Sequence, residues 1–171
     1  MTFEIRKPVI RDAEQILDLL AADYGRLGLT LNDLEERTAR FLNPDSPREN
    51  LVIDDGEIQA MMSVGNWKYG DAAPFTRGGL RLTRALGTIG YYDAAKGVFV
   101  MSARDYNVNS PLDQAFNKIV KPTQTYCIPM LAADIEGQAL LERHEFTPGK
   151  HGMSQPFGEQ VLWTNTMHKV R

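Results

Sequence analysis

Residues 134–146 read Asp-Ile-Glu-Gly-Gln-Ala-Leu-Leu-Glu-Arg-His-Glu-Phe, and they follow the apolar run Tyr126–Ala133. The run is rich in residues that favour strands, and Asp134 is a residue type that caps helix N-termini. The three apolar residues 139–141 then supply the buried face of a helix. This stretch predicts a strand, a capped helix and a return of the chain at Phe146.

A second strand–helix unit lies upstream of this stretch. Val98–Met101 is an apolar run typical of a buried strand. Ser110, Pro111 and Asp113 follow as an N-cap residue, a proline at the first helical position and an acidic residue in the first turn. The order predicts a strand that leads through a short loop into a helix beginning after Ser110.

The N-terminal half contains simpler elements, each predicted from local periodicity and turn residues. Asp12 with Gln15 three residues later is a capping-box pattern. The predicted elements are a strand at Phe3–Arg6, a helix from Asp12 to Gly25, a helix opened by Thr30, and a hairpin of Leu51–Ile53 and Ile58–Val64.

Residues 65–96 show no single period and are punctuated by glycines, so they are interpreted as an insertion with a short helix near Leu80–Leu86. Arg77, Arg81 and Arg84 are spaced to form one basic edge of that helix. Such an edge could contact a nucleotide phosphate, DNA or an acidic partner. The simpler interpretation is a solvated face, because the chain carries a net charge of −3.

Composition limits the class of protein. A chain of 171 residues with 43% hydrophobic and 24% charged residues is typical of one globular domain. The single cysteine, Cys127, lies in an apolar run and predicts a core residue in a reducing compartment. No apolar run approaches the roughly 20 residues that span a bilayer, so we expect a cytoplasmic protein without a membrane partner.

The order of the predicted elements resembles the GNAT N-acetyltransferase family over nearly the whole chain. Residues 134–146 are similar to the late segment of that family, with matches at Leu140, Glu142, Arg143 and Phe146. The resemblance implies a single α/β domain over residues 1–171, with the insertion at about 65–96. It implies a central mixed, mostly antiparallel sheet of six to seven strands flanked by helices, in which the strands near residues 100 and 130 splay apart.

The resemblance also implies a place for acyl-CoA, with acetyl-CoA as the expected co-substrate. The pantetheine would lie along the backbone of Met101, Ser102 and Ala103. The family's pyrophosphate motif falls on residues 104–110, where asparagines replace two glycines and Asp105 adds a repulsive charge unless it points away. The alternative interpretation is a simple turn and helix cap. The implied phosphate-binding residues are Arg104, Asn107, Val108, Asn109 and Ser110.

Other departures from the family pattern affect catalysis. Leu141 occupies the position of the family's proton-donating tyrosine, so Tyr106, Tyr126 or solvent would have to serve. Glu145 replaces a glycine before Phe146. The candidate bases are Glu57, Asp105 and Asp134, each of which also suits a turn or a cap. The catalytic set predicted from the sequence is Glu57, Tyr106 and Asp134.

Three functions are compatible with this pattern. The first is an acyl-CoA-dependent N-acyltransferase that acetylates an amine of a small molecule or protein. The second is an inactive GNAT-like binding or structural protein, such as a component of a phage particle, which would place it in the virion. The third is a GNAT-like enzyme that modifies DNA bases. The resemblance further suggests a homodimer, and three scattered histidines with one cysteine predict no metal site.

Overall fold

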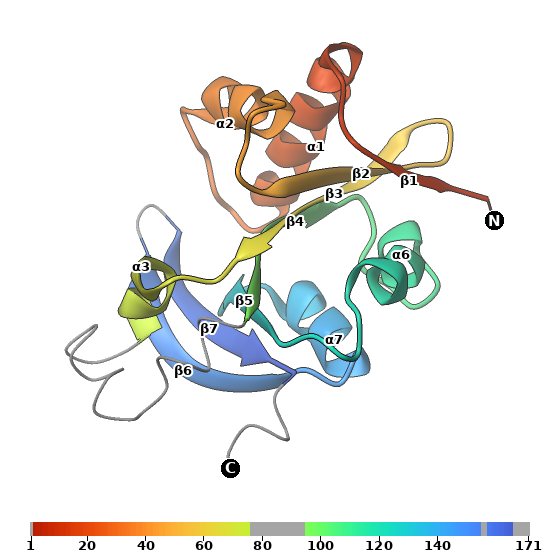
Figure 1. The fold of residues 1–171 in the computed structure, drawn as a ribbon. Helices are drawn as coiled ribbons and strands as arrows, with labels where there is room; N and C mark the ends of the chain where they lie inside the picture. The colour runs from red at the N-terminus through yellow and green to blue at the C-terminus, as the bar shows by residue number, and fades with distance from the viewer. Residues whose placement is uncertain (1, 76–94, 155–156, 166–171) are drawn as a thin grey trace. The chain divides into compact units, whose positions relative to one another are not determined.

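The computed structural model describes residues 2–75, 95–154 and 157–165. Within these ranges, seven strands are hydrogen-bonded in the order β1-β2-β3-β4-β5-β7-β6 (Figure 1). The β4–β5 pair is parallel, whereas β1–β2, β2–β3, β5–β7 and β6–β7 are antiparallel, which confirms the predicted mixed sheet. The strands are β1 (Glu4–Arg6), β2 (Glu49–Asp54), β3 (Ile58–Asn66), β4 (Lys96–Ala103), β5 (Tyr126–Leu131), β6 (Thr147–Ser154) and β7 (Gly158–Thr164).

Helices flank the sheet. No helix of the described part of the chain is both long and apolar enough to cross a membrane. Contacts divide the chain into two compact units, residues 1–64 with 99–119 and residues 65–98 with 120–171. The helices are η1 (Ile10–Asp12), α1 (Ala13–Arg26), α2 (Leu34–Leu42), α3 (Tyr69–Ala72), η2 (Ala73–Phe75), α6 (Pro111–Ile119) and α7 (Ile135–Arg143).

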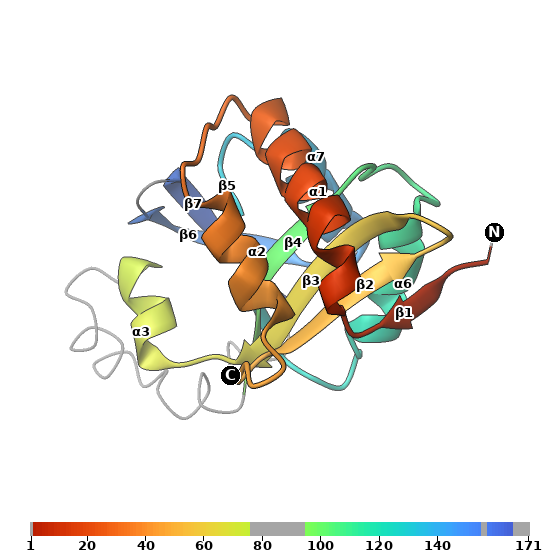
Figure 2. The ribbon, with the colours of Figure 1, turned by 90° about the horizontal axis from the view of Figure 1, so that it is seen from above.

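In the first unit, α1 and α2 cover one face of β2 and β3, and α6 lies on the other face (Figure 2). The apolar stripe of α1 packs onto the sheet because its members recur at helical spacing. The buried residues of this core come from four elements, so α1 and α2 pack directly on β2 and β3. Its buried members are Ile16, Leu19, Leu20, Phe41, Val52, Ile58 and Met61.

The start of α1 differs from the prediction. Asp12 precedes the helix, but its side chain makes no capping hydrogen bond. Its carboxylate instead accepts from Arg6 Nη1 and Nη2 at 2.8 and 2.9 Å and from the Val9 N–H at 2.7 Å. Gln15 accepts from the Ile58 N–H at 2.9 Å and does not complete a capping box. Asp12 pairs with Arg6 of β1 in place of capping α1, because the hydrogen bonds of the ion pair are charge-assisted and nearly buried.

Two helix boundaries also move. Gly25 lies inside α1, and the positive φ of +73° that follows the helix belongs to Gly28. The second helix begins at Leu34 and not at Thr30, because Asp33 precedes it and its carboxylate accepts from Arg37 Nε at 2.9 Å. The hairpin of β2 and β3 is confirmed, with Gly56 in the turn at φ +111°.

In the second unit, β4 and β5 pair at Lys96–Tyr126 and Gly97–Cys127. The predicted separation of the two strands beyond these pairs stays a prediction. The cap of α7 is confirmed, since the Gly137 N–H donates to Asp134 Oδ1 at 2.8 Å. Cys127 is fully buried, as expected of a core residue.

The strand β6 was not predicted from the sequence. This strand contains Pro148, Gly149 and Gly152, residue types that weaken a strand, and its register to β7 shifts between Pro148 and His151. A Cβ at Gly152 would overlap the carbonyl oxygen of Pro74 in η2. The glycine therefore permits close backbone approach, and pairing with β7 decides the conformation where local propensity does not.

The chain turns at Glu145 as a glycine would. Glu145 has φ +65°, and the Phe146 N–H donates to the Leu141 carbonyl at 3.0 Å. The α7-to-β6 turn is therefore retained with a strained non-glycine residue. The helix expected near residues 80–86 and the basic edge of Arg77, Arg81 and Arg84 lie outside the described residues.

Candidate functional site

The segment between β4 and α6 carries the residues expected to hold CoA phosphates. Arg104 stands at its start, where its N–H donates to the Gln59 carbonyl at 2.9 Å and its Nε donates to the Ile58 carbonyl at 3.0 Å. Both partners belong to β3. Arg104 thus fixes the end of β4 against β3, and its Nε is already engaged.

Residues 105–110 form a tight turn that is closed by their own side chains. The Asn107 N–H donates to Asp105 Oδ1 at 2.8 Å, and the Ser110 N–H donates to the Asn107 carbonyl at 3.1 Å. Of the two asparagines that stand in place of the family's glycines, Asn109 has the left-handed backbone, with φ +66°, and Asn107 does not. The Asn109 N–H donates to Asp113 Oδ2 at 2.9 Å.

The same turn caps α6. The Asp113 N–H donates to Ser110 Oγ at 3.1 Å, which is the capping bond predicted from the sequence. Two carboxylates of the chain itself, those of Asp105 and Asp113, thus accept from backbone N–H groups of this turn. These hydrogen bonds are the ones expected of a turn and helix cap, the alternative interpretation, and phosphate binding by the turn stays a prediction.

The strand before this turn is mostly buried. Met101 is half-buried, whereas Ser102 and Ala103 have exposed fractions of only 2% and 4%. Val108, at the tip of the turn, is 61% exposed. The backbone of Met101–Ala103 and the turn are continuous along the chain, but their assignment to acyl-CoA stays a prediction.

Tyr106 points inward to α1. Its hydroxyl lies 3.0 Å from both carboxylate oxygens of Asp23, and the Arg26 guanidinium lies 4.5 Å from the centre of its ring. Arg26 Nη2 also pairs with Asp23 Oδ1 at 3.0 Å. Ser102 adds a further hydrogen bond to Asp23. The side chain predicted as a proton donor is therefore a buried anchor that ties the turn to α1.

Burial raises the pKa of the Asp23 carboxyl, and Arg26 and Tyr106 oppose this rise. Sequence reasoning missed Asp23 because a single acidic residue in a helix is unremarkable by itself. The available signal was its position, four residues after Leu19 on the buried face of α1.

The other predicted catalytic residues lie in a turn and at a helix cap. Glu57 is exposed in the β2–β3 turn, where its N–H donates to Asp55 Oδ1 at 3.3 Å. Asp134 caps α7 and belongs to the second unit. No hydrogen bond among the described residues joins Glu57 to Tyr106. Leu141 is fully buried in α7, so this position supplies packing and no proton.

A cavity of about 460 Å³ opens within the first unit, between α2 and the sheet. Its apolar lining comes from α1, α2, β3 and β4. Phe99 and Val100 of β4 line it directly before Met101, so the cavity and the predicted CoA segment share one strand. The apolar residues of the lining are Leu20, Phe41, Met61, Phe99 and Val100.

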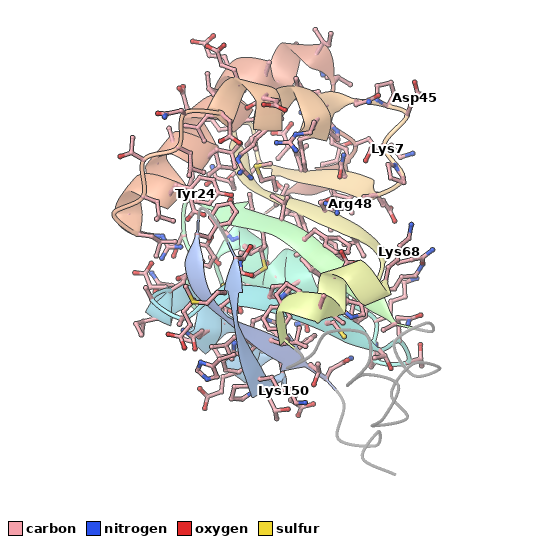
Figure 3. The ribbon with its side chains drawn as sticks, turned by 90° about the vertical axis from the view of Figure 1, so that its left-hand side faces the viewer. Lys7, Tyr24, Asp45, Arg48, Lys68 and Lys150 are labelled. Atoms are coloured by element: carbon pink, nitrogen blue, oxygen red, sulfur yellow. The ribbon has the colours of Figure 1, made fainter. Side chains whose placement is uncertain are left out.

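Two buried polar residues brace the cavity wall. Asn50 Nδ2 donates to the Phe41 carbonyl at 2.9 Å, and Ser63 Oγ donates to Asn50 Oδ1 at 2.7 Å. Tyr24 also lines the cavity, and burial raises the pKa of its hydroxyl while Arg37 opposes the rise. Figure 3 labels three of the lining residues, Tyr24, Arg48 and Asp45. The two hydrogen bonds of Asn50 tie β2 to α2 and to β3 at the cavity wall.

Residues that could bind a metal or act as a thiol nucleophile were compared across the described part of the chain. No cluster of three His, Cys, Asp or Glu residues that could hold a metal occurs there. His151 Nδ1 lies 2.7 Å from Glu159 Oε1 on the surface. Burial raises the pKa of Cys127 to about 12, so its thiol is protonated at neutral pH.

No protein-family model and no curated protein matches this sequence. Solved structures do match. An aminoglycoside N(6')-acetyltransferase from Legionella pneumophila is 11% identical with a TM-score of 0.66, covering 95% of this chain and 90% of that one. A GNAT-family acetyltransferase from Streptococcus agalactiae is 11% identical with a TM-score of 0.65, covering 95% and 94%. AAC(6')-Ib in complex with paromomycin and acetyl-CoA is 12% identical with a TM-score of 0.62, covering 98% and 94%.

These proteins share little sequence with this chain, but nearly the whole of each chain is matched in three dimensions. The β4-turn-α6 segment, the strand β5 and the capped α7 occur here in the order that the sequence predicted. On this evidence the chain has the fold of the GNAT acetyltransferases.

Proposed function

We propose that the protein is an acyl-CoA-dependent N-acyltransferase that transfers an acetyl group to an amine. The observation that supports the proposal is that β4 lines the cavity and then continues into the turn before α6. Phe99 and Val100 line a cavity large enough for a small acceptor, and residues 101–110 continue into the turn expected to hold CoA. An amine in the cavity would therefore lie beside the segment assigned to the thioester.

The chemistry is an acyl transfer. The amine nitrogen bonds to the thioester carbonyl carbon, the carbon–sulfur bond breaks, the nitrogen loses a proton and the sulfur gains one. Acetyl-CoA supplies the activated acyl group. Asp45 is the carboxylate among the described residues that line the cavity. We assign it to accept the amine proton, directly or through water.

The backbone of Met101–Ala103 and the turn would hold the co-substrate. The turn has the left-handed residue at Asn109 and the N-terminus of α6 that suit a phosphate group. Its two internal carboxylates would be displaced on binding.

A second candidate is a GNAT-fold protein without catalysis, which serves in binding or structure. Two observations favour it. Asp105 and Asp113 already occupy N–H groups of the turn, and buried Leu141 stands where the resemblance expects a proton-donating tyrosine. This candidate predicts no binding of CoA in a titration.

Calorimetric titration with acetyl-CoA separates the two candidates. The transferase predicts micromolar binding. It predicts weaker binding in an Asn107→Asp, Asn109→Asp variant, because two added charges repel the pyrophosphate. It predicts binding roughly thirtyfold tighter in Asp105→Asn, Asp113→Asn, because each of the two exposed like-charge contacts costs about 1 kcal/mol and the amide oxygen can still accept the loop N–H.

Arg11→Gln is the matched control, since Arg11 is exposed in η1 and lies outside the turn and the cavity. Its titration should equal that of the unmodified protein. Absence of heat up to millimolar acetyl-CoA in all variants would reject the transferase and leave the binding protein.

A further inference from the structure

The cavity in the first unit has a charge that differs from that of the whole chain. Three arginines line it, Arg37, Arg40 and Arg48, and Asp45 is the acidic residue among its described lining. Their formal charge is therefore +2, whereas the chain as a whole carries −3. A local excess of positive charge over an apolar floor attracts anions in spite of the overall negative charge.

Arg48 is the best placed of the three. Its guanidinium lies 3.9 Å from the centre of the Phe99 ring, and no carboxylate of the described residues lies within ion-pair distance of it. Stacking on an aromatic face orients a guanidinium and leaves the N–H groups at its edge available for a planar anion. Phe99 belongs to β4, so Arg48 is held at the strand that lines the cavity.

Arg40 and Arg37 differ in how firmly they are paired. Arg37 Nε donates to Asp33 Oδ1 at 2.9 Å, which fixes its direction. Arg40 Nη2 is 3.9 Å from Asp33 Oδ2, and its side chain is 63% exposed. The pairing of Arg40 is weak enough for an anion to replace it. Two guanidinium groups, those of Arg40 and Arg48, therefore line the same cavity without a strong ion pair among the described residues.

We propose that this cavity selects acceptor amines that also carry an anionic group, a carboxylate or a phosphate, which Arg48 and Arg40 bind. The inference rests on the proposed function for the transfer itself. It deepens that function by naming the substrate class. Asp45 attracts the ammonium group of the same molecule before transfer. A polycationic acceptor such as paromomycin is disfavoured, because the lining is net positive.

Matched acceptor pairs test the proposal. Phosphoethanolamine is compared with ethanolamine, and β-alanine with β-alaninamide, by release of CoA thiol from acetyl-CoA. The anionic member of each pair should have a kcat/KM at least about tenfold higher, since each charge-assisted hydrogen bond is worth about a factor of ten. The phosphate and carboxylate pairs decide which anion is preferred.

The double variant Arg40→Gln, Arg48→Gln should lose that preference, so that the ratio within each pair falls to about one. Arg48→Lys keeps the charge but not the planar fork and should retain an intermediate ratio. Arg11→Gln should retain the full ratio. Equal rates within both pairs, a preference for paromomycin or a preference unchanged in the double variant would overturn the proposal.

A direct binding experiment separates this inference from the transferase itself. Phosphoethanolamine and ethanolamine are titrated without acetyl-CoA into the unmodified protein and into the double variant. Binding of the phosphorylated amine that is lost in the double variant supports the anion site even if acetyl-CoA does not bind. If acetyl-CoA binds but the two amines do not differ in titration or in rate, the anion site is rejected. The proposed transferase function is then unaffected.

Discussion

The Tyr106 hydroxyl lies 3.0 Å from both carboxylate oxygens of Asp23, and the two residues are 83 positions apart in the sequence. The contact joins α1 to the turn that follows β4. Arg26 completes the cluster by pairing with Asp23 and stacking on the Tyr106 ring. A buried polar network of this kind is stabilising only while every member is satisfied.

Tyr106→Phe should therefore lower the free energy of unfolding by about 1–3 kcal/mol, because Asp23 loses a donor inside the protein. Chemical denaturation of Tyr106→Phe, Asp23→Asn and the double variant measures this. We expect the two losses to be less than additive, since both remove the same contact. A loss of acetyl transfer of more than about 100-fold with unchanged stability would instead make Tyr106 the proton donor.

The Arg6–Asp12 pair predicts a dependence of stability on pH. Hydrogen bonds from Arg6 lower the pKa of Asp12 from its usual value, so the folded state binds fewer protons than the unfolded state in acid. The stabilisation is complete above the unfolded pKa of about 3.9 and is lost as the pH falls through the lower, folded pKa. Asp12→Asn should lose about 2–4 kcal/mol at neutral pH and converge with the unmodified protein in strong acid.

Urea unfolding between neutral pH and pH values below the folded pKa tests this pattern. Asp18→Asn, at an exposed position of α1, should leave the curve unchanged. A difference between Asp12→Asn and the unmodified protein that stays constant down to the lowest pH would contradict the assigned ion pair.

Glu145 predicts a stabilising substitution. Its φ of +65° is strained for a residue with a Cβ, at a cost of about 1–2 kcal/mol, part of which glycine gives back as entropy of the unfolded chain. Glu145→Gly should raise the free energy of unfolding by about 0.5–1 kcal/mol. Glu145→Ala keeps the strain and should bring no gain. Glu142→Gly, inside α7, should lower the free energy of unfolding by about 1 kcal/mol. Thermal unfolding of the three variants and the unmodified protein measures these differences.

Gly152 of β6 should resist enlargement. A Cβ there would overlap the backbone of Pro74, and Gly152→Ala should cost about 1–3 kcal/mol. Gly70→Ala is the control, because nothing lies within 4 Å of the Cβ that it would add. Equal melting temperatures for the two variants would show that η2 does not pack on β6 in solution.

Cys127 should be inert in the folded protein. With its pKa raised to about 12 by burial, only about one thiol in 10,000 is ionised at pH 8. A thiol-specific reagent should react slowly at native conditions and rapidly in denaturant. Fast reaction of the folded protein would place Cys127 on the surface.

Elements whose caps and turns depend on residues a few positions apart could be predicted from the sequence. The cap of α7 at Asp134, the cap of α6 at Ser110 and the β2–β3 turn at Gly56 all depend on neighbours two to four positions away. The order of these elements, with the match at residues 134–146, was enough to identify the fold. It also indicated a left-handed residue at Asn109, because asparagine tolerates that backbone conformation.

Contacts between residues far apart in the sequence could not be predicted, because they depend on how the elements pack. The sequence predicts Asp12 as a helix cap, but in the structure it pairs with Arg6. Residues 147–154 have the composition of a loop, but in the structure they pair with β7 as the strand β6. The cavity is invisible in the sequence, because Arg48 and Phe99 stand 51 positions apart and meet only after β2 and β4 enter the same sheet. Local hydrogen bonds and periodicity specify elements, whereas ion pairs and cavities depend on packing between elements, which no short window of sequence contains.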